Sequence, residues 1–281
     1  KLVFDAGGTN LRIAVSADGR SISRVMTLPT PKTYRRLVLL FRRMATTVLE
    51  PKSVTAVAGG VPGTLDLRHE KIDYCTQLPG WAHKPLKHDL ERLFGVPARI
   101  ENDSALAGLG EIQFGKLKNV PIVAYIGFGT GVGGCRYVRG KIDVRSVGFE
   151  PGRHYLFLPS SAHKHPTPHH GDWESSVSGV ALKLRFQREA KALHEKKIWR
   201  QVAADIGTGL VNVTLFWSPN VIVLGGSLMK RLPFSVIRKE FVRRLRIFPH
   251  KPKIVRGVLG DYAGLYGGLA LLQTFRSTHG R

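Results

Sequence analysis

Two apolar stretches, Leu2–Phe4 and Leu11–Ser16, flank the segment Asp5-Ala6-Gly7-Gly8-Thr9-Asn10. This pattern predicts two strands joined by a glycine turn. Glycines permit a positive φ and a close backbone approach, so the N–H groups of the turn can surround an anion. Asp5, at the end of the first strand, could hold a hydrated cation, and the Thr9 hydroxyl could donate to a phosphate. A plain hairpin turn is the competing interpretation.

A second glycine-rich segment follows the predicted strand Val120–Ile126 and has the sequence Gly127-Phe128-Gly129-Thr130-Gly131-Val132-Gly133-Gly134. It is not a P-loop, because no Gly-Lys-Ser/Thr follows it. It also lacks the dinucleotide-binding pattern, which needs a helix where Val132–Val138 continues as a strand. Two strand–glycine–strand turns in one chain predict a phosphate-binding cleft between two similar halves.

A third glycine pair, Gly225-Gly226, follows the apolar strand Val221–Leu224. Backbone without side chains would let a flat adenine ring lie against it. A simple turn between a strand and a helix explains the same residues, so both interpretations stay open.

Strand and helix patterns alternate along the chain, which predicts the α/β class. Short apolar runs closed by glycines, such as Val54–Ala58 before Gly59-Gly60, are typical of buried strands. The helical spacing of apolar residues predicts helices at Thr33–Leu49, Pro85–Phe94, Ser175–Leu193, Trp199–Trp217, Pro233–Leu245 and Tyr262–Phe275. We expect a domain boundary near residue 115.

The charge of the chain is unusual, because 43 Lys and Arg residues against 20 Asp and Glu residues give a net charge of +23. Such a charge attracts nucleic acid, membranes and polyanionic substrates alike. The basic residues are spread out, however, and form no basic tail, zinc finger or leading helix-turn-helix segment. A solvated basic surface is the simplest interpretation, although Lys183–Arg200 and Lys230–Arg256 are dense stretches.

The remaining composition narrows the class of protein. Of the 281 residues, 43% are hydrophobic, which excludes a disordered chain. No stretch approaches the roughly 20 apolar residues of a membrane span. Two cysteines, Cys75 and Cys135, form no disulfide framework and favour a reducing cytoplasm.

Asn102 and Asp103 follow the predicted strand Ala98–Ile100, at a junction with a helix. Side chains at such a junction project into a cleft, and either residue could simply be a helix N-cap. In a kinase, a carboxylate at this place would accept the proton of a sugar hydroxyl during phosphoryl transfer.

Six segments occur in one particular order: Asp5–Asn10, Gly59-Gly60-Val61-Pro62-Gly63, Leu78-Pro79-Gly80-Trp81, Glu101-Asn102-Asp103, Gly127–Gly134 and Gly225-Gly226. In this order the chain resembles the ROK family (repressors, open reading frames, sugar kinases) of the hexokinase–actin superfamily. The resemblance implies two ribonuclease-H-like lobes of the actin/hexokinase type with a cleft between them. The small lobe would comprise residues 1–114 and the helix in 262–281, and the large lobe residues 115–261.

The resemblance also implies roles for individual residues. Asp103 would be the catalytic base, and Asp5 would hold magnesium, directly or through water. The residues that would bind ATP are Asp5, Gly7, Gly8, Thr9, Asn10, Gly129, Thr130, Gly131, Gly225 and Gly226. The residues that would bind the sugar are Gly63, Thr64, Asn102, Asp103, Glu150 and Glu174.

The sequence departs from the family pattern at three places that concern sugar binding and zinc. Gln77 stands where Asn usually precedes Leu-Pro-Gly-Trp, and Arg153 stands at the position of a histidine, with His154 one place later. The cysteine-rich zinc segment is missing, so we expect no structural zinc. The same interval contains four histidines that could bind a metal or lie in a polar exposed loop: His163, His165, His169 and His170.

The implied activity is the phosphorylation of a hexose hydroxyl, glucose by default, with ATP and Mg²⁺. The expected protein is a cytoplasmic homodimer that binds neither nucleic acid nor membrane. Two alternatives stay open. The first is a sugar kinase that uses polyphosphate, which the charge favours, and the second is a sugar-responsive transcription regulator of the same family, which the missing DNA-binding segment disfavours.

Overall fold

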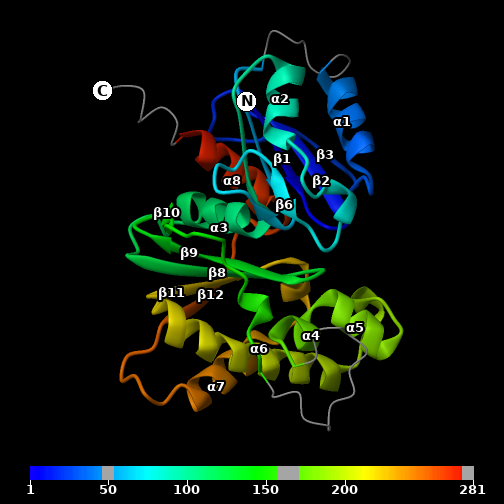
Figure 1. The fold of residues 1–281 in the computed structure, drawn as a ribbon. Helices are drawn as coiled ribbons and strands as arrows, with labels where there is room; N and C mark the ends of the chain where they lie inside the picture. The colour runs from blue at the N-terminus through cyan, green and yellow to red at the C-terminus, as the bar shows by residue number, and fades with distance from the viewer. Residues whose placement is uncertain (46–53, 157–170, 274–281) are drawn as a thin grey trace. The chain divides into compact units, whose positions relative to one another are not determined.

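The computed structural model describes residues 1–45, 54–156 and 171–273 and divides the chain into two compact units (Figure 1). The first unit comprises residues 1–118, 144–148 and 261–281, and the second comprises residues 119–143 and 149–260. The expected lobes differ from these units mainly in residues 144–148, which belong to the first unit. Among the described residues, no helix is long and apolar enough to cross a membrane.

The first unit is built on a five-stranded sheet in the order β3-β2-β1-β4-β7. Its strands are β1 (Leu2–Ala6), β2 (Asn10–Val15), β3 (Ser23–Pro29), β4 (Val57–Val61) and β7 (Ala98–Asn102). The strands β1, β2 and β3 are antiparallel neighbours, whereas β1, β4 and β7 run parallel. The unit also contains α1 (Tyr34–Arg43), α2 (Leu86–Phe94), α3 (Asp103–Phe114), α8 (Ala263–Gln273) and a small hairpin of β5 (Thr64–Leu65) and β6 (Ile72–Tyr74).

Strand β1 is apolar except for Asp5 because helices cover both faces of its sheet. Leu2 and Phe4 pack in one core cluster with Phe41 of α1. Val3, which points to the opposite face, packs with Leu265 and Leu269 of α8. Side chains alternate between the two faces of a strand, so a strand that is buried on both sides has a continuous apolar sequence.

The second unit repeats this design with a sheet in the order β10-β9-β8-β11-β12. Its strands are β8 (Ile122–Phe128), β9 (Val132–Val138), β10 (Lys141–Ile142), β11 (Val221–Gly225) and β12 (Lys253–Arg256). Again three strands are antiparallel neighbours, and β8, β11 and β12 run parallel. The repeated strand order and direction confirm the α/β class and the two similar halves that the glycine turns predict.

The helices of the second unit are α4 (Trp173–Val177), α5 (Gly179–Phe186), α6 (Lys196–Trp217) and α7 (Phe234–Arg244), with short turns η4 (Pro151–Arg153), η5 (Ala190–Ala192) and η6 (Ser227–Lys230). The prediction of one helix over Ser175–Leu193 is wrong. Ser178 is extended and its hydroxyl accepts a hydrogen bond from Ala181 N–H, so it ends α4 and caps α5. A serine N-cap in the middle of an apolar pattern is the physical reason for the break.

Glycines allow α3 and α8 to pack backbone against backbone in the first unit. A Cβ atom added to Gly267 of α8 would lie 1.8 Å from Leu106 O of α3. One added to Gly110 of α3 would lie 2.2 Å from Ala263 O of α8. This contact explains why α8 is a helix despite its internal glycines, and it attaches α8 to α3.

We expect Gly267→Ala to lower the free energy of unfolding by about 1–3 kcal/mol, because the new methyl group must displace a backbone carbonyl. Helix propensity alone would give the opposite sign, a gain of about 1 kcal/mol. Urea denaturation of the variant measures the change. Gly80→Ala is the control, since its Cβ would lie 3.7 Å from Lys32 O, an ordinary contact. A Gly267→Ala variant as stable as the parent would contradict the close packing.

Candidate functional site

Asp5 and Asp103 lie near each other in the first unit, at the ends of neighbouring elements. Asp5 belongs to β1 and Asp103 begins α3 directly after β7, and β4 lies between these two parallel strands. A Cβ atom added to Gly60 of β4 would lie 3.0 Å from Asp103 Cα and 3.4 Å from Asp5 Oδ1. One added to Gly264 of α8 would lie 2.4 Å from Asp5 Cγ. Two glycines therefore make the space for this carboxylate pair.

The surroundings of the pair oppose the ionisation of both carboxyls. Burial raises the pKa of Asp5 to about 6, against the attraction of the Arg12 guanidinium. Burial, followed by the charge of Asp5, raises the pKa of Asp103 to about 7. The Ser104 backbone N–H and hydroxyl donate to Asp103 Oδ1 over 2.7 and 3.3 Å, which orients the carboxylate. A group that titrates near neutral pH is suited to accept a proton.

Asn102 is the N-cap of α3, as one of the two interpretations of its position predicts. Its Oδ1 accepts a hydrogen bond of 3.0 Å from Ala105 N–H, and its Nδ2 donates one of 2.9 Å to Gly63 O. Gly63 has a φ of +91°, and a Cβ added there would lie 2.1 Å from Tyr74 O. The side chain of Asn102 therefore fixes the position of the turn that precedes Thr64.

The first glycine turn is held by hydrogen bonds to its own backbone. Gly7 N–H donates to Asn10 O over 3.0 Å, and the Thr30 hydroxyl donates to Gly7 O over 2.7 Å. Gln77 lies directly against the turn, because a Cβ added to Gly8 would lie 1.8 Å from Gln77 Oε1. The Gln77 side chain, which is one methylene longer than an Asn side chain, thus places its amide at the predicted phosphate turn.

A buried ion pair beside the acids was missed by the sequence analysis. Arg145 Nη2 contacts Glu101 Oε1 at 2.6 Å, and His69 Nδ1 lies 3.4 Å from Glu101 Oε2. Glu101 Oε1 also accepts a hydrogen bond of 2.8 Å from Asn102 N–H. The carboxylate of Glu101 within the short strand β7 was the available signal, but its partners are distant in sequence.

In the second unit, the second glycine turn and the Gly225-Gly226 pair lie side by side. Strands β8 and β11 are parallel, and Gly127 pairs with Gly225. Gly226 has a φ of +89°, and a Cβ added there would lie 2.2 Å from Phe128 O. The two segments that were predicted to bind phosphate and adenosine are therefore neighbours.

The start of α5 supports the second glycine turn. Gly179 N–H donates to Gly129 O over 2.8 Å, and Val180 N–H donates to Thr130 O over 3.2 Å. Within the turn, Gly129 N–H donates to Gly131 O over 3.0 Å. These bonds fix the carbonyl groups of the turn on α5, so its conformation is set before any ligand binds.

Two of the predicted sugar-binding acids surround Arg153. Glu150 directly precedes η4. Burial lowers the pKa of the Arg153 guanidinium, but the charges of Glu174, Asp172 and Glu150, with the hydrogen bond to Asp172, raise it overall. Arg153 Nη2 lies 2.9 Å from Glu174 Oε1, and Arg153 Nη1 lies 3.1 Å from Asp172 Oδ2. Glu174 Oε2 accepts a hydrogen bond of 2.7 Å from Val132 N–H, at the end of the glycine turn.

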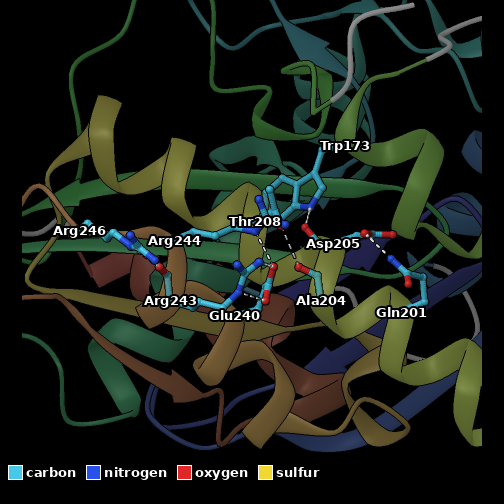
Figure 2. A network of polar contacts seen from close by, with 9 residues as sticks. All are labelled: Trp173, Gln201, Ala204, Asp205, Thr208, Glu240, Arg243, Arg244 and Arg246. Carbon is cyan, nitrogen blue, oxygen red and sulfur yellow. Dashed lines mark hydrogen bonds and ion pairs between the residues drawn. The ribbon is translucent and has the colours of Figure 1, made fainter.

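A hydrogen bond attaches α4, which carries Glu174, to α6 (Figure 2). The Trp173 indole N–H donates to Asp205 O of α6 over 3.2 Å, and within α6 Gln201 Nε2 donates to Asp205 Oδ1 over 2.9 Å. On α7, Glu240 accepts hydrogen bonds from Arg243 and Arg244. The Trp173 contact supports α4 on α6, although α4 is only five residues long.

His154 stacks on Trp173 with ring centroids 4.9 Å apart, and its buried Nε2 has no hydrogen-bond partner among the described residues. Burial lowers the pKa of His154. The four predicted loop histidines, His163, His165, His169 and His170, lie outside the described residues. In the part of the chain that the structure describes, no group of three or more His, Cys, Asp and Glu residues could hold a metal ion.

Known proteins similar to this chain share its length and fold. A putative fructokinase from Bacillus subtilis is 27% identical over 95% of this chain and 93% of its own. The crystal structure of a ROK hexokinase from Thermus thermophilus has a TM-score of 0.78 at 27% identity and covers 98% of this chain and 99% of its own. A ROK family glucokinase from Streptomyces griseus, in complex with glucose and AMPPNP, has a TM-score of 0.79 at 24% identity and covers 96% of this chain and 98% of its own.

The family assignment follows from a match along almost the full sequence. The model of the ROK family matches residues 2–275. The matched range includes both sheets, both glycine turns and the Asp5–Asp103 pair, and the fold agrees with that of solved ROK structures. This protein belongs to the ROK family.

Proposed function

We propose that the protein is an ATP-dependent sugar kinase that phosphorylates a hexose hydroxyl, with Asp103 as the general base. The observation that carries this proposal is the position of Asp103, half-buried at the start of α3 beside Asp5, with a pKa of about 7. A base is most effective when its pKa lies near the operating pH, because it is then ionised and still binds a proton well. The names of its relatives, fructokinase and hexokinase, support the same class of reaction.

Phosphoryl transfer needs positioning and charge stabilisation rather than covalent chemistry from the protein. The first glycine turn and the Thr9 hydroxyl would donate hydrogen bonds to phosphate oxygens. The second turn, with Gly129, Thr130 and Gly131, would do the same in the second unit. Gly225 and Gly226, next to that turn, would present backbone to the adenine ring. Backbone N–H groups that are already fixed in position need not rearrange when charge develops on the phosphate, so little free energy is spent on reorganisation.

The acids of the first unit fit a magnesium ion. Mg²⁺ is usually held by one or two carboxylates together with waters and substrate phosphates, and Asp5 offers a carboxylate that the backbone of Gly60 and Gly264 holds in place. When bound, the ion supplies positive charge to the phosphates. A cation beside Asp5 would also offset the repulsion between Asp5 and Asp103, so both acids can be ionised together.

The proposed sugar-binding residues are Gly63, Thr64, Asn102, Asp103, Glu150 and Glu174. The similar proteins differ in the sugar they are named for, so the family leaves the choice of hexose open. A turnover assay with ATP across glucose, fructose, mannose and N-acetylhexosamines tests the proposal. ATP binding without turnover of any sugar in this panel would contradict it.

We propose ATP rather than polyphosphate as the donor, because several arginines of the dense basic stretches are engaged in the fold. Arg238 donates to Ile254 O over 2.7 Å, and Arg256 donates to Met229 O over 2.7 Å. Both guanidinium groups also stack on the ring of Phe234. These side chains stabilise loops of the second unit, so part of the high charge has a structural use.

The expected homodimer and the cytoplasmic location belong to this proposal as well. Both cysteines, Cys75 and Cys135, are buried thiols and not a disulfide, which fits a reducing compartment. Light scattering after size-exclusion chromatography measures the number of chains.

Replacing the base should separate chemistry from binding. We expect Asp103→Asn to lower kcat by on the order of 10²–10⁴ while the sugar affinity stays within a few-fold, because the amide keeps the shape and cannot accept the proton. Steady-state kinetics and sugar titration measure the two effects. Asp73→Asn, the same change at an exposed carboxylate, is the control. A loss in kcat of less than about tenfold would make Asp103 a helix residue without a proton-transfer role.

The pH dependence of kcat/KM should reflect the titration of Asp103. Protonated Asp103 cannot act as a base, so kcat/KM should fall as the pH drops through about 7. Asp5→Asn removes the negative charge that raises the pKa of Asp103, so the acid limb of its residual activity should move to lower pH. An acid limb that moves to higher pH in this variant would contradict the coupling.

The salt dependence should distinguish the two donors. We expect the KM for ATP to change by less than about fivefold between roughly 50 and 200 mM salt, a range in which a groove with many phosphate contacts would lose about 10³-fold in affinity. Kinetics with ATP and with polyphosphate at both salt concentrations measure this. A higher kcat/KM with polyphosphate and a steep salt slope would assign that donor instead.

A further inference from the structure

Arg153 joins two segments of the second unit that are about twenty residues apart in the sequence. Arg153 is the last residue of η4, and its guanidinium forms ion pairs with two carboxylates at the start of α4. Nη1 lies 3.1 Å from Asp172 Oδ2 and Nη2 lies 2.9 Å from Glu174 Oε1. A planar guanidinium can bind two acceptors in fixed directions, which a lysine ammonium does not do.

Each of these carboxylates is also held at its second oxygen by a backbone N–H. Asp172 Oδ1 accepts a hydrogen bond of 2.7 Å from Ser175 N–H and caps α4. Glu174 Oε2 accepts one of 2.7 Å from Val132 N–H. A continuous path of hydrogen bonds therefore runs from the end of the second glycine turn through Glu174 and Arg153 to the N-terminus of α4.

The path leaves Glu174 with one orientation. Its Oε1 contacts the Arg153 guanidinium and its Oε2 accepts a hydrogen bond from Val132 N–H, so the side chain cannot turn without breaking a charge-assisted hydrogen bond. Glu150 adds a third negative charge near Arg153, so the guanidinium offsets the repulsion among three acids. Without it, this repulsion would turn the carboxylates apart.

We propose that Arg153 is a positioning residue for acceptor binding: it holds Glu174 fixed against the second glycine turn, so that the orientation of this acid is set before the sugar arrives. The inference rests on the proposed function, because it assigns Glu174 to the acceptor. Arg153 acts through Glu174 and does not itself contact the sugar. Sugar affinity should therefore depend on the pair and not on either side chain separately.

A double-mutant cycle tests this dependence. We expect Arg153→Gln to weaken sugar affinity, measured by calorimetry, by about tenfold, in keeping with the loss of a charge-assisted hydrogen bond. Arg153→Lys should recover only part of this loss, because an ammonium cannot bridge both acids in the same geometry. In a Glu174→Gln background, Arg153→Gln should change sugar affinity by less than about twofold, since its effect has already been removed.

Loss of Arg153 should also destabilise the fold through Asp172, and this effect must be separated from the effect on sugar affinity. The Asp172 side chain is only 3% exposed, so loss of Arg153 leaves a buried charge and should lower the free energy of unfolding. Urea denaturation of every variant measures this part, which acts through Asp172 and should persist in the Glu174→Gln background. Arg188→Gln is the matched control, because Arg188 pairs with Glu195 on the surface of the same unit.

The outcomes are distinct. Coupled effects on sugar affinity, together with a raised KM for the sugar and a kcat within about threefold, support the inference. Additive effects on sugar affinity would overturn it and indicate a purely structural arginine or a direct sugar contact. Sugar binding without turnover in the parent protein would contradict the proposed function, while the affinity cycle would still decide the role of Arg153.

Discussion

The close approach of two carboxylates, Asp5 and Asp103, is the constraint on which the rest of the first unit depends. Burial raises the pKa of Asp5 to about 6, and burial followed by the charge of Asp5 raises the pKa of Asp103 to about 7. The fold makes room for the pair because two residues without side chains lie against it. Gly60 of β4 and Gly264 of α8 supply that backbone. The glycine contacts between α3 and α8 therefore serve the site as well as the stability of the unit.

Much of this arrangement could be predicted from the sequence because local patterns determine it. The glycine turn after β1 and the strand–helix junction at Asn102 have short-range signals, and the repeated strand–glycine–strand pattern predicts the two similar sheets. The contacts that were not predicted join residues far apart in the chain. Arg145 belongs to residues 144–148, a segment of the first unit that is flanked in the sequence by parts of the second unit. Its ion pair with Glu101 therefore has no pattern in the sequence that indicates it.

The second unit shows how charged residues are used where the sequence suggested only a basic surface. Arg238 and Arg256 bind backbone carbonyls, and Arg153 holds a cluster of acids together. Charge counts cannot distinguish these uses, since an arginine that donates to a carbonyl and one that faces solvent have the same sequence pattern. The break between α4 and α5 was missed for a related reason: a single serine cap interrupts an otherwise helical pattern.

The central claim is that Asp103 is a base whose pKa is set by burial and by Asp5. The most direct test is NMR titration of the protein with ¹³C-labelled Asp carboxyls, without substrates or magnesium. The account predicts two carboxyl signals that titrate with apparent pKa values of about 6 and about 7, the higher of which is lost in Asp103→Asn. If every Asp carboxyl titrates in the ordinary range near 3.9, the account is contradicted.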